Sequence, residues 1–177
     1  TAGSLLGDMG IATFSVLSFI YSLANAVLSG ISQGLQPLWG QSFGRKDDRT
    51  LKDLFHTGLK ISIFCSAVIC VLLIVFRVPV VTLFNGDPEL VKMASEALPV
   101  FSLSFLFMAV NLIFTAYFYS TKQTLKSDVI ALSRGIVLKS LAIFLIPTLL
   151  GSGFLWYPLV VAEILTLLLC LLLRKLP

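Results

Sequence analysis

The sequence predicts an all-α integral membrane protein, a bundle of about five transmembrane helices. Hydrophobic residues make up 57% of the 177 residues, charged residues make up 12%, and the mean hydropathy is +0.97. Soluble domains contain about 25% charged residues. One soluble core of this size could not bury so many apolar side chains, so lipid is the solvent that they are expected to face.

Two spans are expected in the N-terminal part of the chain. No charged residue occurs in residues 9–43, which form the first expected span, and about 20 apolar residues are enough to cross a bilayer as a helix. Pro37 is expected to kink this helix or to end its regular stretch. The second span is expected over residues 54–76, with Asp47 or Asp48 as the N-cap of its helix.

The third span, expected over residues 88–120, has a clear start. Asn85 and Gly86 are a turn signal, and Asp87 is a good N-cap. Pro88 suits the first position of a helix, where its missing N–H costs nothing. We therefore expect a long helix that begins at this proline.

The last two spans are expected over residues 127–150 and 155–173, on either side of a glycine-rich break. The fourth span carries Arg134 and Lys139 in its first half, so these turns are expected to face protein or the membrane interface. The fifth begins near Trp156, an aromatic residue typical of the interface.

The basic residues lie mostly at one end of this array. Eight fall beside the first loop, the third loop and the C-terminus, whereas only Arg77 and Lys92 fall on the opposite side. The positive-inside rule then places loop 45–53 and the C-terminus in the cytoplasm, in a multi-pass protein of the plasma membrane. The net charge of +4 is explained by these flanking groups, so we expect no nucleic-acid partner. The eight are Arg45, Lys46, Arg49, Lys52, Lys122, Lys126, Arg174 and Lys175.

Three segments carry more specific patterns. They are GISQGLQPLWGQSFGRKD at residues 30–47, VTLFNGDPELVKMASEAL at residues 81–98, and YFYSTKQTLKSDVIALSRGIVLK followed by GSGFLWYPLVVAEILT at residues 117–166. In this order and at this spacing they resemble helices eight to twelve of the multidrug and toxic-compound extrusion (MATE) family of cation-coupled exporters. The resemblance implies a twelve-helix fold of two lobes, of which residues 1–177 supply part of the C-terminal lobe.

This resemblance also implies a function. The chain is expected to be part of an antiporter that exports cationic or amphipathic compounds by alternating access, driven by H⁺ or Na⁺ and without a cofactor. Its expected partners are the lipid bilayer, small organic cations or drugs, and an N-terminal lobe that this chain lacks. The full-length protein is expected to be monomeric. The chain starts at Thr1 without a signal-peptide pattern, which favours a fragment that does not transport by itself.

Polar residues and glycines mark the first span. Gln33 and Gln36 lie deep in the charge-free segment, where an amide side chain must find a partner. We expect them to line a substrate cavity, with Pro37 allowing the helix to bend, or to join a neighbouring helix as packing contacts. Gly30 and Gly34 have small-xxx-small spacing, which predicts close contact between helices.

Glu163 is the strongest candidate for a functional charge, because it stands near the middle of the fifth span. An ionised carboxylate at a helix centre in the bilayer costs at least about 2.5 kcal/mol, so Glu163 must be neutral, paired or hydrated. It is expected either to help couple ion movement to export or to bond a neighbouring helix. The resemblance implies that Asn111 stands where some family members carry an acidic residue, so a hydrogen-bonding role in the cavity is expected for it instead of an ion site.

Arg134 is expected to be a structural anchor that pairs with Asp128 or caps a carbonyl group. No Ser-His-Asp set, phosphate-binding loop or metal-ligand spacing occurs, and His56 is the only histidine. We therefore expect neither an enzyme nor a metal site. Two alternatives to the antiporter remain: a lipid-precursor flippase of related fold, and a non-transporting, truncated membrane subunit.

Overall fold

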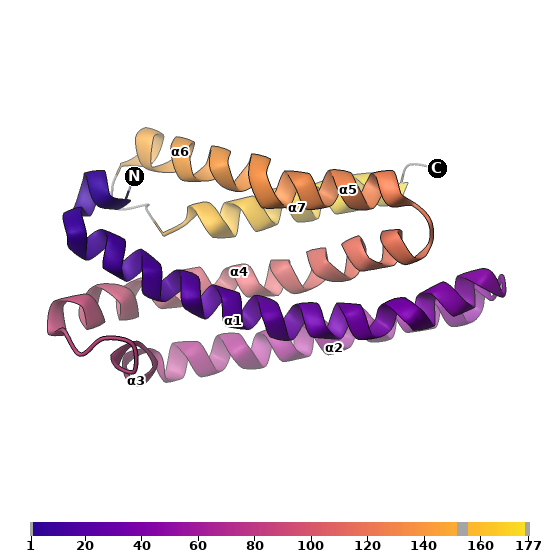
Figure 1. Ribbon diagram of the computed structural model, residues 1–177, viewed down its shortest axis with the longest axis horizontal. Helices are drawn as coiled ribbons and strands as arrows, with labels where there is room; N and C mark the ends of the chain where they lie inside the picture. Colours follow the sequence, from indigo (N-terminus) through magenta and orange to yellow (C-terminus); the bar gives the residue numbers. More distant parts are fainter. Residues whose placement is uncertain (1, 152–155, 176–177) are drawn as a thin grey trace.

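The computed structural model describes residues 2–151 and 156–175, which form a bundle of helices (Figure 1). No strand occurs in these two ranges, so the predicted all-α class is confirmed. The elements are α1 (Ala2–Gly44), α2 (Asp48–Val75), α3 (Arg77–Thr82), α4 (Pro88–Ser120), α5 (Thr124–Leu132), the π-helical turn η1 (Ser133–Val137), α6 (Leu138–Leu150) and α7 (Pro158–Lys175).

Four helical segments in the described ranges are long and apolar enough to cross a membrane. They cover Gly7–Gly44, Asp48–Val75, Pro88–Ser120 and Thr124–Leu149. The fifth expected span corresponds to α7, which has only 18 residues. Its single stretch of 18 residues therefore includes all three of its charges, Glu163, Arg174 and Lys175, whereas each of the four longer segments contains a stretch of that length with at most two charged residues.

Local signals explain where the helices begin. The Asp87 carboxylate accepts hydrogen bonds from the backbone N–H groups of Glu89 and Leu90, so the predicted N-cap of α4 is confirmed. Asp47 caps α2 in the same way by accepting from the N–H of Thr50 at 3.0 Å. Hydrogen bonding by the side chain of Thr50, and then by its backbone N–H, lowers the pKa of the Asp47 carboxyl below its ordinary value because it favours the ionised form.

Two helical segments are interrupted at positions that the sequence did not predict. α1 continues through Pro37 to Gly44, so the proline does not end the helix. Its break in regular geometry instead falls at Gly7, with φ 62° and ψ −154°, a conformation that glycine adopts without steric cost. The fourth expected span is not one regular α-helix, because the turn η1 separates α5 from α6.

Helix α4 is the central element of the bundle. It contacts α1, α2, α3, α5 and α7, and Figure 1 shows it running between the pair α1–α2 and the group formed by α5, α6 and α7. Phe105, Met108 and Ile113 of α4 are fully buried. Large apolar side chains on other helices face outward instead, such as Phe64 at 68% and Phe144 at 69% exposed, as suits a surface covered by lipid.

The turns gather at two ends of the bundle. The α1–α2 turn, the α4–α5 turn and the end of α7 lie at the same end, on the right of Figure 1. The eight basic residues named above belong to these three segments or to the first turns after them. The grouping of basic residues expected from the sequence is therefore also a grouping in space.

Candidate functional site

A cluster of charged and polar side chains joins the helices near the middle of the bundle. Its centre is Glu163, on the face of α7 that packs against α4, with no exposed surface. We call it the charged cluster and define it by five residues. They are Tyr21 of α1, Asn111 of α4, Arg134 of η1, Lys139 of α6 and Glu163 of α7.

Arg134 neutralises Glu163. The Nε atom of Arg134 lies 3.1 Å from Oε1 and 3.2 Å from Oε2 of Glu163, and the arginine side chain is only 15% exposed. The expected pairing of Arg134 with Asp128 is therefore wrong, because the guanidinium is directed across the bundle to α7. Such a pair offsets the cost of two buried charges only if further hydrogen bonds complete it.

Arg134 lies in a π-helical turn, six residues after Asp128, a spacing that does not place two side chains side by side on a helix. Ser133–Val137 forms backbone hydrogen bonds between residues five apart, whereas an α-helix joins residues four apart. The extra residue changes the direction in which every later side chain of the segment points. Arg134 is the second residue of this turn and Lys139 lies just after it, and both reach Tyr21. π-Helical turns occur often at functional sites, so η1 is itself a reason to regard this region as the candidate site.

Tyr21 connects the charges. Its hydroxyl donates to Glu163 Oε1 at 3.2 Å and accepts from Lys139 Nζ at 2.7 Å and from Arg134 Nη2 at 3.3 Å. A phenol has one proton to donate and two lone pairs, so this hydroxyl is fully used. Arg134 Nη2 also reaches Oδ1 of Asn25 at 3.4 Å, which ties a second position of α1 to the cluster.

Asn111 holds α7 against α4. Its Nδ2 group donates to the backbone carbonyl of Glu163 at 2.9 Å and to Oε2 of the same residue at 2.8 Å. The thiol of Cys170 approaches Oδ1 of Asn111 at 3.8 Å. Asn111 is fully buried, so its hydrogen bonds join two helices, and it lines none of the cavities described below.

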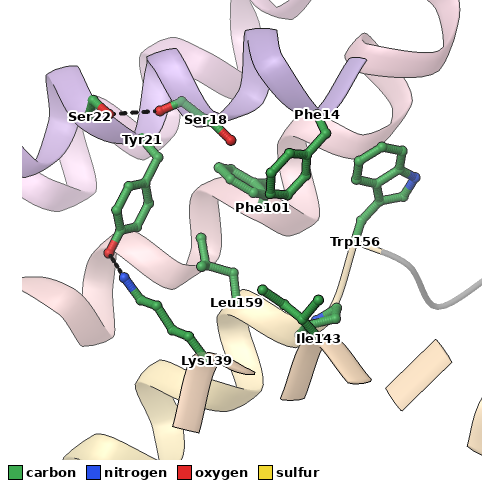
Figure 2. A pocket seen from close by; sticks show the side chains of 10 residues that line it. Phe14, Ser18, Tyr21, Ser22, Phe101, Lys139, Ile143, Trp156 and Leu159 are labelled. Carbon is green, nitrogen blue, oxygen red and sulfur yellow. Dashed lines mark hydrogen bonds between the residues drawn. The ribbon is translucent and has the colours of Figure 1, made fainter. Parts of the chain in front are cut away.

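Two cavities open beside the charged cluster, and both are lined in part by Tyr21 and Lys139. The first has a volume of about 280 Å³ and walls from α1, α4, α6 and the start of α7. In Figure 2 the aromatic rings of Phe14, Phe101 and Trp156 gather at one end, and the Tyr21–Lys139 pair lies at the other. The second cavity, of about 230 Å³, also includes Arg134 in its lining.

Gln33 and Gln36 do not join this site. They line a separate cavity of about 310 Å³ together with Thr115 and Ser127. Gln33 is exposed, Gln36 is half-buried, and Pro37 is exposed without lining that cavity. This cavity shares Thr115 with the second cavity beside the charged cluster, but neither glutamine lines a cavity that Tyr21 and Lys139 line.

The close helix contact expected at Gly30 and Gly34 is not made within the described chain. A Cβ atom built at either position has no neighbour within 4 Å, because both glycines lie on an outward face of α1. The tight approach occurs at Gly58 of α2 instead, where a Cβ atom would lie 2.6 Å from Cδ1 of Leu35.

Tyr21 and Asn25 are members of the site that the sequence did not single out. Each lies in a charge-free apolar segment and gives only the weak signal of a polar group there. Lys139 was noted as a charge within a span, but its position beside Tyr21 depends on the contact between distant helices. Across residues 2–151 and 156–175, no group of three or more His, Cys, Asp or Glu side chains comes together as a metal site.

Comparison of sequences identifies related proteins. The MatE family profile matches residues 1–152. The multidrug export protein MepA of Staphylococcus haemolyticus (strain JCSC1435) is 26% identical over 158 residues, which cover 89% of this chain and 34% of that protein. The chain thus spans about a third of the length of this relative.

Comparison of structures gives the same fold. An outward-facing multidrug resistance MATE family transporter matches 98% of this chain, over 40% of its own length, with a TM-score of 0.88 and 19% identity. An inward-facing structure of such a transporter matches 98% of this chain, over 41% of its own length, with the same TM-score and identity. The bundle is thus similar to one part of these larger folds in both conformations.

Proposed function

Because this chain belongs to the MatE family of multidrug efflux transporters, we propose that it forms part of an antiporter that exports cationic or amphipathic compounds. The observation that carries the proposal is the Arg134–Glu163 pair, buried beside two cavities in a membrane bundle. Ionisable groups inside such bundles commonly mark ion or substrate pathways. Proteins of this family are transporters rather than enzymes, so we assign no catalytic residue.

Alternating access is the mechanism that we propose for this export. The chain resembles outward-facing and inward-facing transporters equally well, with a TM-score of 0.88 to each. This similarity supports a movement in which these helices travel as one body against an N-terminal lobe. That lobe is the principal partner that we propose for the chain, within a monomeric full-length protein in the lipid bilayer.

An H⁺ or Na⁺ gradient is the proposed energy source, and Glu163 is the carboxylate of this chain that is best placed to respond to it. Its two oxygens accept from Arg134, Tyr21 and Asn111. An arriving cation must therefore displace a donor, and it would loosen the contacts of α7 with α1 and η1. In this way ion binding would be coupled to helix packing.

We further propose that the turn at residues 45–53 and the C-terminus face the cytoplasm of a plasma-membrane protein. The eight basic residues around the α1–α2 turn, the α4–α5 turn and the end of α7 support this orientation through the positive-inside rule. A cysteine introduced in place of Arg49 should resist an impermeant maleimide in intact cells and react after lysis. Labelling in intact cells would show that this turn lies outside the cell and would contradict the proposed orientation.

Efflux measurements test the transport proposal. Cells that express the chain alone should accumulate ethidium like control cells, whereas the reading frame extended upstream should lower accumulation until an ionophore removes the gradient. In the extended protein, Glu163→Gln should abolish the effect, and Glu96→Gln, at an exposed position of α4, should not. Gradient-driven export by the chain alone would contradict the need for a second lobe, and export that survives Glu163→Gln would remove Glu163 from coupling.

A lipid-precursor flippase of related fold is the second candidate. The observation that favours it is the presence of two basic side chains, Arg134 and Lys139, in the lining of one cavity. Cationic drugs give no evident reason for a lysine at such a position. Translocation of a fluorescent lipid phosphate by vesicles containing the extended protein, without ethidium export, would select this function.

A further inference from the structure

We propose that the cavity between α1, α4, α6 and α7 binds the negatively charged end of an amphipathic molecule, with Lys139 as the residue that receives it. This inference deepens the proposed export function, on which it rests for the fate of the molecule. Binding itself needs no transport and can be measured separately.

The charged cluster contains more positive than negative side chains. Arg134 and Glu163 neutralise each other across 3.1 Å. Lys139 is bonded at 2.7 Å to the neutral hydroxyl of Tyr21. Within the part of the chain that the structure describes, no carboxylate lies within 4.0 Å of the Lys139 ammonium. Two cations and one anion leave an excess positive charge inside a membrane bundle, which an anionic ligand would offset.

The cavity has a charged end at Lys139 and aromatic walls beyond it. Lys139 forms one end of a space of about 280 Å³, and its Nζ atom lies 4.6 Å from the centre of the Tyr21 ring. Figure 2 shows the rings of Phe14, Phe101 and Trp156 farther along the same cavity. Aromatic walls favour a flat apolar body, so the cavity fits a small aromatic molecule with a negative head.

The same geometry disfavours a cation at this end of the cavity. A positive head would meet the ammonium of Lys139 directly. The one carboxylate of the cluster, Glu163, is fully buried and already accepts from Arg134, Tyr21 and Asn111. The cluster therefore offers an anion the ammonium of Lys139 directly, whereas a cation reaches the carboxylate of Glu163 only by displacing one of these donors.

Matched probes of opposite charge test this inference. The chain, purified in phosphatidylcholine nanodiscs, would be equilibrated with naphthalene-2-sulfonate or with 2-naphthyltrimethylammonium, and bound probe would be measured by dialysis. We expect the sulfonate to bind at least about tenfold more tightly than the ammonium probe, the factor typical of losing one charged hydrogen bond. Equal binding of the two probes by the unaltered chain would overturn the proposal without any variant.

Substitutions of Lys139 test whether this residue binds the sulfonate. Lys139→Met should weaken sulfonate binding at least about tenfold, and Lys139→Arg should retain it. Lys60→Met is the matched control, because Lys60 is exposed on α2 and lines none of the cavities described above. Sulfonate binding that is the same in the Met and Arg variants at position 139 would contradict the role of Lys139.

The source of the anion is distinguished by the lipid. If phosphatidylglycerol in the nanodisc displaces the sulfonate from the unaltered chain, a lipid head group is the occupant; if it does not, the occupant is a water-soluble amphiphile. Either result supports an anion site at Lys139. Sulfonate binding without efflux would count against the exporter only, and efflux without selective binding would count against this site only.

Discussion

The charged cluster and an aromatic cluster both pack on α4, yet different forces hold them together. In the aromatic cluster, ring centres lie as close as 4.7 Å, between Phe55 and Tyr117. The indole N–H of Trp39 is buried there without a hydrogen-bond partner among the described residues, whereas Tyr21 and Glu163 use their polar atoms fully. The aromatic cluster consists of Trp39, Phe55, Phe114, Tyr117 and Phe118.

Because different forces hold the two clusters together, we expect them to respond differently to the loss of one side chain. Rings that touch through dispersion lose only their own contacts, and in lipid the unfolded helices are also in an apolar solvent. Charges that neutralise each other leave an uncompensated partner behind, and this costs more than the pair contributes. We therefore expect single substitutions to be most damaging in the charged cluster.

The largest effect is expected for Arg134→Leu. Glu163 would remain buried with no ion-pair partner within 4.0 Å in the described part of the chain, and the free energy of unfolding in detergent should fall by about 3–5 kcal/mol. Adding Glu163→Leu should recover most of this loss, because both charges are then gone. Arg45→Leu, at an exposed turn, is the control. A double variant no more stable than Arg134→Leu would contradict the account of the charged cluster.

Phe114→Ala should have a smaller effect, although it removes a side chain that is only 3% exposed. We expect a loss of about 2 kcal/mol, below the range of soluble cores, because lipid supplies no hydrophobic penalty for the separated helices. Phe64→Ala, at a position 68% exposed, should change the unfolding midpoint little. A loss as large as that of Arg134→Leu would remove the distinction between the clusters.

Glycine substitutions test the packing beside the aromatic cluster. Gly58→Ala places a Cβ atom 2.6 Å from Cδ1 of Leu35, a flexible side-chain end, so we expect a cost of about 1 kcal/mol. Gly30→Ala meets open space and should stabilise α1 by about 0.5 kcal/mol through helix propensity. Thermal unfolding of the two variants in one detergent makes the comparison, and a cost at Gly30 would show that another surface packs there.

Local and distant interactions explain what the sequence could predict. The start of α4 was predictable because Asp87 and Pro88 act on backbone groups within three residues. The Arg134–Glu163 pair joins positions 29 residues apart and depends on a π-helical turn, so no spacing rule gives it. The need for Glu163 to be paired was predictable from the cost of a buried charge, but the identity of its partner was not.

The surroundings of Gln33 and Gln36 were likewise only partly predictable from the sequence. Hydropathy identifies polar groups that avoid lipid, but the neighbouring helices decide which cavity receives them. The structure gives them a cavity with Thr115 and Ser127, apart from the charged cluster. The small-xxx-small spacing at Gly30 also predicted contact without identifying the helix that makes it. Tertiary contacts, which a single-helix pattern does not contain, account for each of these differences.

The smallest effect concerns the N-cap of α2, the helix that brings Phe55 to the aromatic cluster. Hydrogen bonding by the side chain and the backbone N–H of Thr50 holds the pKa of the Asp47 carboxyl below its ordinary value of 3.8. Its contribution to stability is therefore complete above pH 3.8 and is lost as the pH falls through the lower folded value. In the variant Asp47→Asn, the side-chain amide oxygen accepts the same bond without titrating. The unaltered chain should thus lose stability relative to this variant only in acid, measured as a difference in unfolding midpoint. If the difference in unfolding midpoint instead grew as the pH rose above 3.8, the pH dependence would have the opposite sign, and the Asp47 cap would not be its source.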